Sequence, residues 1–339
     1  MRLRSIGDTV LSTPSLIALR RFLPAAQIDI LLEDWVAPVL QSFDRVDNVL
    51  TVGRSNWSRI QIARHIRQSK YELAFNLHGG TTATFFVRVS GAKYRVGFES
   101  YQYNFLYTHL APSPQKFWQT EHAHSAEQQL ALLGFVGIPV LDRPKTFLPV
   151  TDKETEDINL FLHIYGIDEE KIALIHPAAA FDTKQWATEN FAKIIDYLAS
   201  RGMYSVVVAT PKEKNIVKEL TENSKASFQS FTNLSLWQIK ALASKSKIFI
   251  GNDSGIAHIA AAVETPSVVI FGSSNINHWR PWTNAPNEIV FNKMPCQPCA
   301  GYFCNEFENA ECIKNVSVEN VAGAIERVLE QTEKNLKSL

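Results

Sequence analysis

Residues 247–272, KIFIGNDSGIAHIAAAVETPSVVIFG, constrain the fold more than any other part of the chain. An apolar run ends at Gly251, a stretch of small residues follows, and a second apolar run closes the segment. Short apolar runs bounded by turn residues are typical of buried strands, and the middle stretch predicts a helix over 255–263. The segment therefore predicts a strand–helix–strand unit, which places the chain in the α/β class with parallel sheets.

The rest of the chain repeats this alternation of apolar runs and amphipathic segments. In the first half, the predicted strands are 27–32, 49–52, 72–77 and 94–96, and the predicted helices are 13–22, 57–68, 82–89 and 123–133. In the second half, the predicted strands are 172–176, 205–209, 247–250 and 267–271, and the predicted helices are 188–201, 212–222, 235–243 and 255–263. Two doubly wound units in tandem therefore predict two Rossmann-like domains.

A segment dotted with Pro139, Pro144 and Pro149 separates the two halves, and such a composition is typical of a passage between domains. A length of 339 residues also exceeds what one hydrophobic core usually organises. We therefore place the domains at 1–150 and 151–339. Only residues 1–4 precede the first turn, whereas a strand usually has about five residues. We expect the first strand to be truncated, or the native start to lie upstream.

The charge balance and the apolar pattern exclude several classes of protein. Lysine plus arginine number 34, as do aspartate plus glutamate, and neither sign forms a long run, which argues against a nucleic-acid partner. The start lacks the apolar core of a signal peptide, and the longest apolar stretch, near 130–141, is too short for a transmembrane segment. We expect a cytoplasmic protein that contacts a membrane only peripherally.

The start of the predicted helix at 255–263 can form an anion site. Asp253 or Ser254 can cap this helix. The amides of Ser254, Gly255 and Ile256 would then be exposed at its amino end, where the helix dipole is positive. A diphosphate would fit such a site. The alternative is that Asp253 only caps the helix and that His258 is a histidine of the core.

A second candidate is IHPAAAFDTKQW, residues 175–186, which leaves a strand through small side chains. Ala179 and Ala180 allow backbone amides to approach a ligand, and Lys184 can stabilise a departing phosphate. The alternative for Lys184 is a solvated surface lysine, which is the commoner situation. We expect Trp186 to be a packing residue.

A third candidate is Asp8 in RLRSIGDTVLSTPSL, residues 2–16, at the mouth of the first helix. Gly7 permits a tight turn, and a carboxylate held there can take a proton from an attacking hydroxyl. The alternative is again a helix cap. We expect His78 to be a packing or surface histidine, although it follows a predicted strand and can line the cleft between the two domains.

All four cysteines fall in one C-x2-C-x4-C-x7-C cluster, formed by Cys296, Cys299, Cys304 and Cys312. Four thiolates can hold zinc, but the usual zinc ribbon separates its two pairs by more residues. We therefore favour reduced packing thiols or an adventitious disulfide over a zinc site. The zinc-protease HExxH, the serine-hydrolase GxSxG and the P-loop motifs do not occur.

Four motifs together, RSIGDTVLSTP, FNLHGG with SGAKYRVGF, HPAAAFDTKQW and GNDSGIAH, resemble glycosyltransferase family 9 in sequence and in order. This family contains the ADP-heptose:lipopolysaccharide heptosyltransferases. The resemblance implies a GT-B fold, in which an acceptor-binding domain (1–150) faces a nucleotide-sugar-binding domain (151–339) across a cleft. It also implies transfer with inversion and without an obligatory metal or other cofactor.

Within this resemblance, Asp8 matches the proposed catalytic base and Lys184 the lysine on the donor phosphates. The other matched donor positions are Ala179, Ala180, Asp253, Ser254, Gly255 and His258. By a looser alignment, Gln229 falls at a ribose contact, where relatives can have an acidic residue. The implied partners are ADP-heptose and a lipopolysaccharide inner-core acceptor at the inner face of the inner membrane.

Two other functions are compatible with the same sequence features. A nucleotide-sugar epimerase would use the same two-domain fold and would convert the donor without an acceptor. A non-catalytic sugar-nucleotide binding protein would bind the donor and release no ADP with any acceptor.

Overall fold

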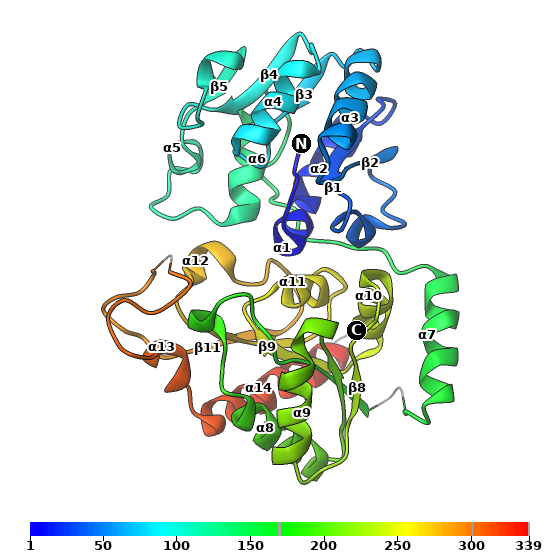
Figure 1. Ribbon diagram of the computed structural model, residues 1–339, viewed down its shortest axis with the longest axis vertical. Helices are drawn as coiled ribbons and strands as arrows, with labels where there is room; N and C mark the ends of the chain where they lie inside the picture. Colours follow the sequence, from blue (N-terminus) through cyan, green and yellow to red (C-terminus); the bar gives the residue numbers. More distant parts are fainter. Residues whose placement is uncertain (169–170, 300, 338–339) are drawn as a thin grey trace. The chain divides into compact units, whose positions relative to one another are not determined.

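The structure is a computed structural model that describes residues 1–168, 171–299 and 301–337. The chain divides into two compact units, Met1–Thr146 and Phe147–Leu339. The division falls a few residues before the boundary that the prolines predicted near residue 150. Both units combine parallel strands with helices (Figure 1), so the predicted α/β class is confirmed.

The first unit contains short parallel strands and six described α-helices. Its strands are β1 (Asp29–Glu33), β2 (Asn48–Val52), β3 (Leu73–Phe75), β4 (Tyr94–Phe98) and β5 (His109–Ala111). Its α-helices are α1 (Ile6–Val10), α2 (Thr13–Phe22), α3 (Asn56–Gln68), α4 (Thr81–Val89), α5 (Pro114–Trp118) and α6 (Ser125–Phe135). The 3-10 turns are η1 (Ala37–Leu40) and η2 (Asn104–Leu106).

Residues 1–4 occupy the position of a strand between β1 and β3. The Arg2 amide donates to the Leu31 carbonyl oxygen at 3.1 Å, and the Leu77 amide donates to the Met1 carbonyl oxygen at 3.0 Å. These bonds connect the β1–β2 pair to the β3–β4–β5 sheet. The order across the unit is therefore β2, β1, residues 1–4, β3, β4, β5, which is the 3-2-1-4-5-6 order of a Rossmann fold.

The second unit is built on one six-stranded parallel sheet in the order β11-β10-β9-β6-β7-β8. Its strands are β6 (Ile172–His176), β7 (Tyr204–Val208), β8 (Gln229–Phe231), β9 (Ile248–Asn252), β10 (Ser267–Phe271) and β11 (Asn287–Phe291). Its α-helices in the described residues are α7 (Asp152–Ile164), α8 (Thr188–Ser200), α9 (Lys214–Asn223), α10 (Leu236–Lys245), α11 (Gly255–Ala262), α12 (Ile276–Trp279), α13 (Glu311–Lys314) and α14 (Val318–Lys337). This order is again 3-2-1-4-5-6 in chain sequence, so the direction of winding reverses between β6 and β9.

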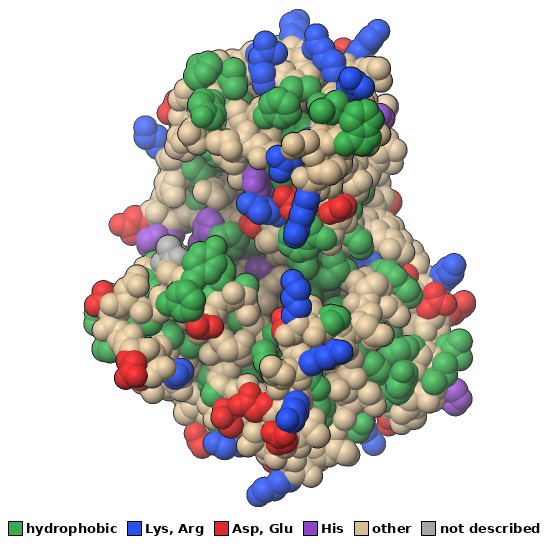
Figure 2. Space-filling model, viewed as in Figure 1, with side chains coloured by type: hydrophobic (Ala, Val, Ile, Leu, Met, Phe, Trp, Pro, Cys, Tyr) green, Lys and Arg blue, Asp and Glu red, His purple; other side chains and the backbone are tan. Residues whose placement is uncertain are grey.

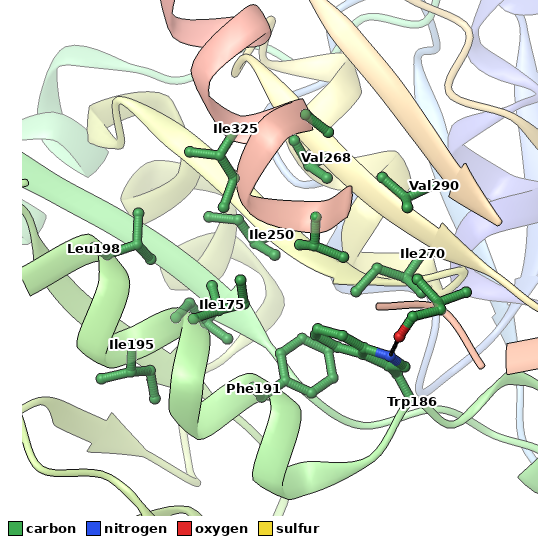
Figure 3. Packing of buried hydrophobic residues seen from close by; sticks show 14 of the residues in the cluster. Ile175, Trp186, Phe191, Ile195, Leu198, Ile250, Val268, Ile270, Val290 and Ile325 are labelled. Atoms are coloured by element: carbon green, nitrogen blue, oxygen red, sulfur yellow. Dashed lines mark hydrogen bonds between the residues drawn. The ribbon is translucent and has the colours of Figure 1, made fainter. Parts of the chain in front are cut away.

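The core of the second unit lies between its sheet and the helices α8 and α14 (Figure 3). Ile175 and Ile250 from the sheet meet Phe191 and Ile325 from these helices, and none of the four is exposed. Burying one such side chain stabilises the fold by about 1.5–3 kcal/mol. Trp186 is also fully buried and donates from Nε1 to the Val316 carbonyl oxygen at 2.9 Å, which confirms that it is a packing residue.

Several elements were not predicted from the sequence. Strands β5 and β8 have only three residues each, and β11 is a half-exposed strand at the edge of its sheet. Helices α7 and α14 are rich in charged residues and bury only a narrow stripe of apolar side chains. Elements that are buried on one side only carry a weaker apolar pattern than the central strands.

Candidate active site

The second unit places its candidate residues where the winding of the sheet reverses. Strands β6 and β9 are neighbours, and His176 pairs with Gly251 at their carboxyl ends. In open α/β sheets, ligands bind beyond the carboxyl ends of strands at this reversal. The loop after β6 leads to Lys184, and the residues after β9 are Asp253 and Ser254.

Lys184 and Asp253 form an ion pair, with Nζ 2.7 Å from Oδ2. Their side chains are 20% and 6% exposed, so the carboxylate is the buried partner and the ammonium is the accessible one. The hydroxyl of Ser274 donates to the same carboxylate oxygen at 2.5 Å. Asp253 therefore holds Lys184 in position, and the N-cap residue of α11 is Ser254 instead.

The amino end of α11 lies next to this ion pair. Ser254 is the N-cap residue and has an extended backbone, but its side chain makes no capping hydrogen bond. The Ser254 hydroxyl instead lies 3.1 Å from Nδ1 of His176. Because the Ser254 side chain does not cap them, the first amides of α11, beginning at Gly255, can bind an anion. His258 lies one turn further along and is buried.

His176 is a site residue that was not predicted from the sequence. Burial lowers the pKa of its imidazole to about 4, although the nearby carboxylate of Glu213 acts in the opposite direction. The ring is therefore neutral near pH 7. Its position as the last residue of the apolar run IALIH, directly before the loop, was the available signal.

The loop after β6 is folded around side-chain amides. The Ala179 amide donates to Oε1 of Gln185 at 2.8 Å, and Nε2 of Gln185 donates to the Pro177 carbonyl oxygen at 2.6 Å. Nδ2 of Asn252 donates to the same oxygen at 2.8 Å. The loop is thus fastened to β9, and the Ala179 amide, which was expected to approach a diphosphate, already has an acceptor.

Gln229 is the first residue of β8, and its Nε2 donates to the Ser230 carbonyl oxygen at 3.1 Å. This is the amino end of an edge strand, whereas Lys184 and Asp253 lie beyond the carboxyl ends of β6 and β9. The structure therefore does not bring Gln229 together with that pair. Its contact with a ribose remains a prediction.

Asp8 lies at the corresponding reversal of the first unit, after residues 1–4. Its carboxylate forms an ion pair with Arg2, and their side chains are 20% and 9% exposed, so here the cation is the buried partner. Arg2 also donates to the Leu77 carbonyl oxygen at 2.5 Å. The amide and hydroxyl of Ser5 donate to the other oxygen of Asp8, at 3.2 and 3.0 Å. Asp8 is therefore both a capping residue of α1 and the accessible member of an ion pair.

His78 follows β3 in the same part of the first unit. Its amide donates to Oδ1 of Asn76 at 3.0 Å, which fixes the turn after the strand. Burial, assisted by the guanidinium of Arg2, lowers the pKa of the His78 ring, while Asp8 acts in the opposite direction. His78 is therefore a neutral side chain in the electrostatic neighbourhood of Asp8.

The four cysteines are reduced and together line a small cavity of about 90 Å³. Burial raises the pKa of the Cys312 thiol, and this side chain packs in the core between the sheet and α14. Within residues 1–168, 171–299 and 301–337, no three His, Cys, Asp or Glu side chains form a group that could hold a metal ion. The cysteine loop is connected to the residue before Lys184: the Cys299 amide donates to the Ser273 carbonyl oxygen at 3.0 Å, and the Ser273 hydroxyl donates to Oγ1 of Thr183 at 2.9 Å.

The chain is similar in sequence to known glycosyltransferases. The family model "Glycosyltransferase family 9 (heptosyltransferase)" matches residues 59–309. Lipopolysaccharide heptosyltransferase 3 of Escherichia coli K12 is 27% identical over 96% of each chain, and lipooligosaccharide heptosyltransferase 2 of Campylobacter jejuni is 23% identical over 98% of this chain and 96% of its own.

Solved structures show the fold. A glycosyl transferase family 9 protein from Veillonella parvula has a TM-score of 0.81 at 19% identity and covers 97% of this chain and 95% of its own. ADP-heptose lps heptosyltransferase II of E. coli has a TM-score of 0.80 at 19% identity, with coverage of 98% and 100%. The fold is thus of the GT-B type, with two Rossmann-like domains, and the chain belongs to glycosyltransferase family 9.

Proposed function

We propose that this protein transfers heptose from ADP-heptose to a lipopolysaccharide inner-core acceptor, with inversion at the anomeric carbon. The observation that carries the proposal is the Lys184–Asp253 pair beside the uncapped amino end of α11, at the reversal point of the second sheet. A fixed ammonium next to helix amides suits a diphosphate. The similar proteins are lipopolysaccharide and lipooligosaccharide heptosyltransferases, which supports heptose as the sugar.

On the donor side, Lys184 and the amides of Ser254 and Gly255 would bind the diphosphate. Asp253 and His258 would contact the donor sugar, and the amide of Ala180 would approach a phosphate oxygen. The amide of Ala179 would do so only after Gln185 releases it. In this proposal the second unit supplies charge stabilisation from its own side chains and amides, and the reaction needs no metal.

On the acceptor side, Asp8 would act as the base. The acceptor hydroxyl gives its proton to the Asp8 carboxylate as its oxygen bonds to the anomeric carbon. The bond from that carbon to the phosphate oxygen breaks, and ADP leaves with the electron pair. Lys184 and the α11 amides stabilise the negative charge that develops on the departing phosphate. Arg2 and Ser5 hold the carboxylate in place before the reaction.

The acceptor would be presented at the inner face of the inner membrane, and the protein would work from the cytoplasm. In the described part of the chain, no helix is long and apolar enough to cross a membrane. Access to a lipid-linked acceptor would therefore depend on the surface of the protein.

The test is turnover by the purified protein with ADP-heptose and an inner-core acceptor. We expect the acceptor to gain the mass of one heptosyl residue and ADP to appear in equal amount. Conversion of ADP-heptose without acceptor would instead identify an epimerase, and donor binding without ADP release from any acceptor would identify a binding protein. Thermal unfolding with ADP-, UDP- and GDP-sugars measures donor selectivity, because at equal concentration the sugar nucleotide that binds the folded state most tightly stabilises it most.

A further inference from the structure

The positive charge of this protein is concentrated in one part of the first unit. The whole chain has as many acidic as basic side chains, but residues 48–98 contain a single acidic residue, Glu72. The same stretch contains eight basic residues: Arg54, Arg59, Arg64, Arg67, Lys70, Arg88, Lys93 and Arg95. Although the chain as a whole is neutral, residues 48–98 are strongly basic, and they span β2, α3, β3, α4 and β4.

Helix α3 turns its basic side chains outward. Ile62 and Ile66 are buried against the sheet, and Arg59, Arg64 and Arg67 are exposed. Within the described residues, no carboxylate forms an ion pair with these three arginines. Three unpaired guanidinium groups on one short helix attract anions.

Apolar side chains are exposed among these arginines. Trp57 is 61% exposed, Phe85 of α4 is 51% exposed and Ile60 is 45% exposed. Ile60, Phe85 and Val89 line a groove of about 400 Å³ between α3 and α4, together with Arg59, Arg64 and Arg67. Figure 2 shows Lys and Arg side chains gathered with hydrophobic side chains at the top of the first unit, where Figure 1 draws these helices.

We propose that this surface, called here the α3–α4 face and formed by Trp57, Arg59, Ile60, Arg64, Arg67 and Phe85, docks on the anionic phospholipid surface of a bilayer. Arginine recognises phosphate oxygens through its paired N–H groups, and each basic residue near an anionic leaflet adds to the binding. Tryptophan, phenylalanine and isoleucine gain by entering the boundary between headgroups and acyl chains. The inference rests on the proposed function only in that the acceptor is carried by a membrane.

The mixture of side chains favours a bilayer over other anionic partners. Double-stranded nucleic acid offers phosphates but no apolar phase for Trp57, Ile60 and Phe85. A bilayer interface offers phosphate groups and an apolar phase together, within the width of the α3–α4 pair. The absence of acidic side chains on α3 and α4 removes the repulsion that would oppose approach to anionic headgroups.

The test is co-sedimentation of the full-length protein with vesicles. One set contains phosphatidylcholine alone, and the other contains equimolar phosphatidylcholine and phosphatidylglycerol. The variant Arg59→Gln/Arg64→Gln/Arg67→Gln is compared with a matched control, Lys225→Gln/Lys334→Gln/Lys337→Gln, which removes the same charge from exposed positions of the second unit. All six side chains are exposed, so both variants should fold.

We expect the parent to bind the anionic vesicles and not the neutral ones. Each lost charge should weaken binding about fivefold at low ionic strength, so the triple arginine variant should bind about 100-fold more weakly. The control should bind like the parent. A separate variant, Trp57→Ser/Phe85→Ser, should also lose binding while keeping all its charges. Equal loss in the arginine variant and the control, or equal binding to both vesicle types, would overturn the proposal.

Turnover separates this inference from the proposed function. With an acceptor embedded in anionic vesicles, the arginine variant should turn over at least tenfold more slowly than the parent. With a deacylated, water-soluble acceptor, the two should turn over equally. If no acceptor is used by the parent, the proposed function fails while the vesicle binding still decides the inference. Equal rates of parent and variant on the embedded acceptor would count against the docking surface.

Discussion

The two units have the same strand order and place an ion pair at the same reversal of their sheets, but the charges are exchanged. In the first unit the buried partner is Arg2 and the accessible partner is the carboxylate of Asp8. In the second unit the buried partner is Asp253 and the accessible partner is the ammonium of Lys184. One scaffold thus presents an anion and the other presents a cation.

Under the proposed function, this difference would let two similar folds supply opposite charges to one reaction. Fold alone does not assign function, since the Rossmann-like order is shared by both units. In the proposed reaction, the sign of the accessible charge distinguishes the roles of the two units. A base must be an anion or a neutral amine, whereas a departing diphosphate needs a cation. The buried partner in each pair fixes the position of the accessible one and so lowers the cost of orienting it in the transition state.

The largest expected effect comes from the anionic site. Asp8→Asn keeps the shape of the side chain but removes the proton acceptor, so kcat should fall about 10³-fold. The dissociation constant of ADP should stay unchanged, because the donor groups belong to the second unit. Steady-state kinetics and calorimetric titration with ADP measure the two quantities.

The control for this variant is Asp47→Asn, which breaks another aspartate–arginine pair of the first unit, with Arg20. Its kcat should equal that of the parent. If Asp8→Asn turned over as fast as Asp47→Asn, Asp8 would be only a capping residue of α1 and the comparison between the units would lose its functional meaning.

The pH dependence of stability should also distinguish the second unit. His176 has a pKa of about 4 in the folded state, below the value near 6.5 of an unfolded chain. Between pH 6.5 and 4 the unfolded chain therefore takes up a proton that the folded unit does not, and stability falls as the pH falls. The full loss is about 3 kcal/mol.

Urea unfolding at pH 7 and pH 4.5 measures this loss. His176→Gln should remove most of the difference that the parent shows between the two pH values. The control is His163→Gln, which changes an exposed histidine of the same unit and should behave like the parent. A parent-like pH dependence in His176→Gln would show that other groups govern acid unfolding.

A smaller effect is expected at the cationic site. Lys184→Gln removes one charged group from the leaving phosphate, so kcat/KM for the donor should fall about 10²-fold. ADP binding should weaken as well, whereas Asp8→Asn should leave it unchanged. Lys184→Arg should retain part of the activity, and Lys218→Gln, at an exposed pair with Glu222, should change neither value. Unchanged ADP affinity in Lys184→Gln would remove the lysine from the donor site.

The central parts of the fold could be predicted from the sequence, while its edges could not. The ends of α2, β6 and β10 were predicted to the residue. Strands β6 and β10 are apolar and buried along their whole length, whereas α2 carries a proline in its first turn and arginines in its last. The edge strand β8 and the charged helix α14 were not predicted, since an element that is buried on one side needs few apolar residues.

The candidate site was predictable where a residue belongs to a short motif. Asp8, Lys184 and Asp253 stand in such motifs, whereas Ser274 and His176 join the site of the second unit only through distant contacts. Ser274 lies 21 residues from Asp253, and His176 meets Ser254 across 78 residues because β6 pairs with β9. The basic α3–α4 face was hidden for another reason: the charges of the whole chain balance, and only residues 48–98 considered alone show the excess.

The smallest expected effect tests whether Asp253 acts as an anchor. Ser274→Ala removes a hydrogen bond to this carboxylate, which should lower the free energy of unfolding by about 1.5 kcal/mol and weaken ADP binding only about threefold. The matched control is Ser244→Ala, which removes a hydroxyl bonded to a neutral carbonyl oxygen on α10. If Ser274→Ala and Ser244→Ala gave the same ADP affinity, the hydrogen bond from Ser274 to Asp253 would not be needed to position Lys184 on the phosphates. A loss as large as that of Lys184→Gln would mean instead that Ser274 contacts the donor directly, and the second unit would then differ from the first in using a hydroxyl as well as a charge.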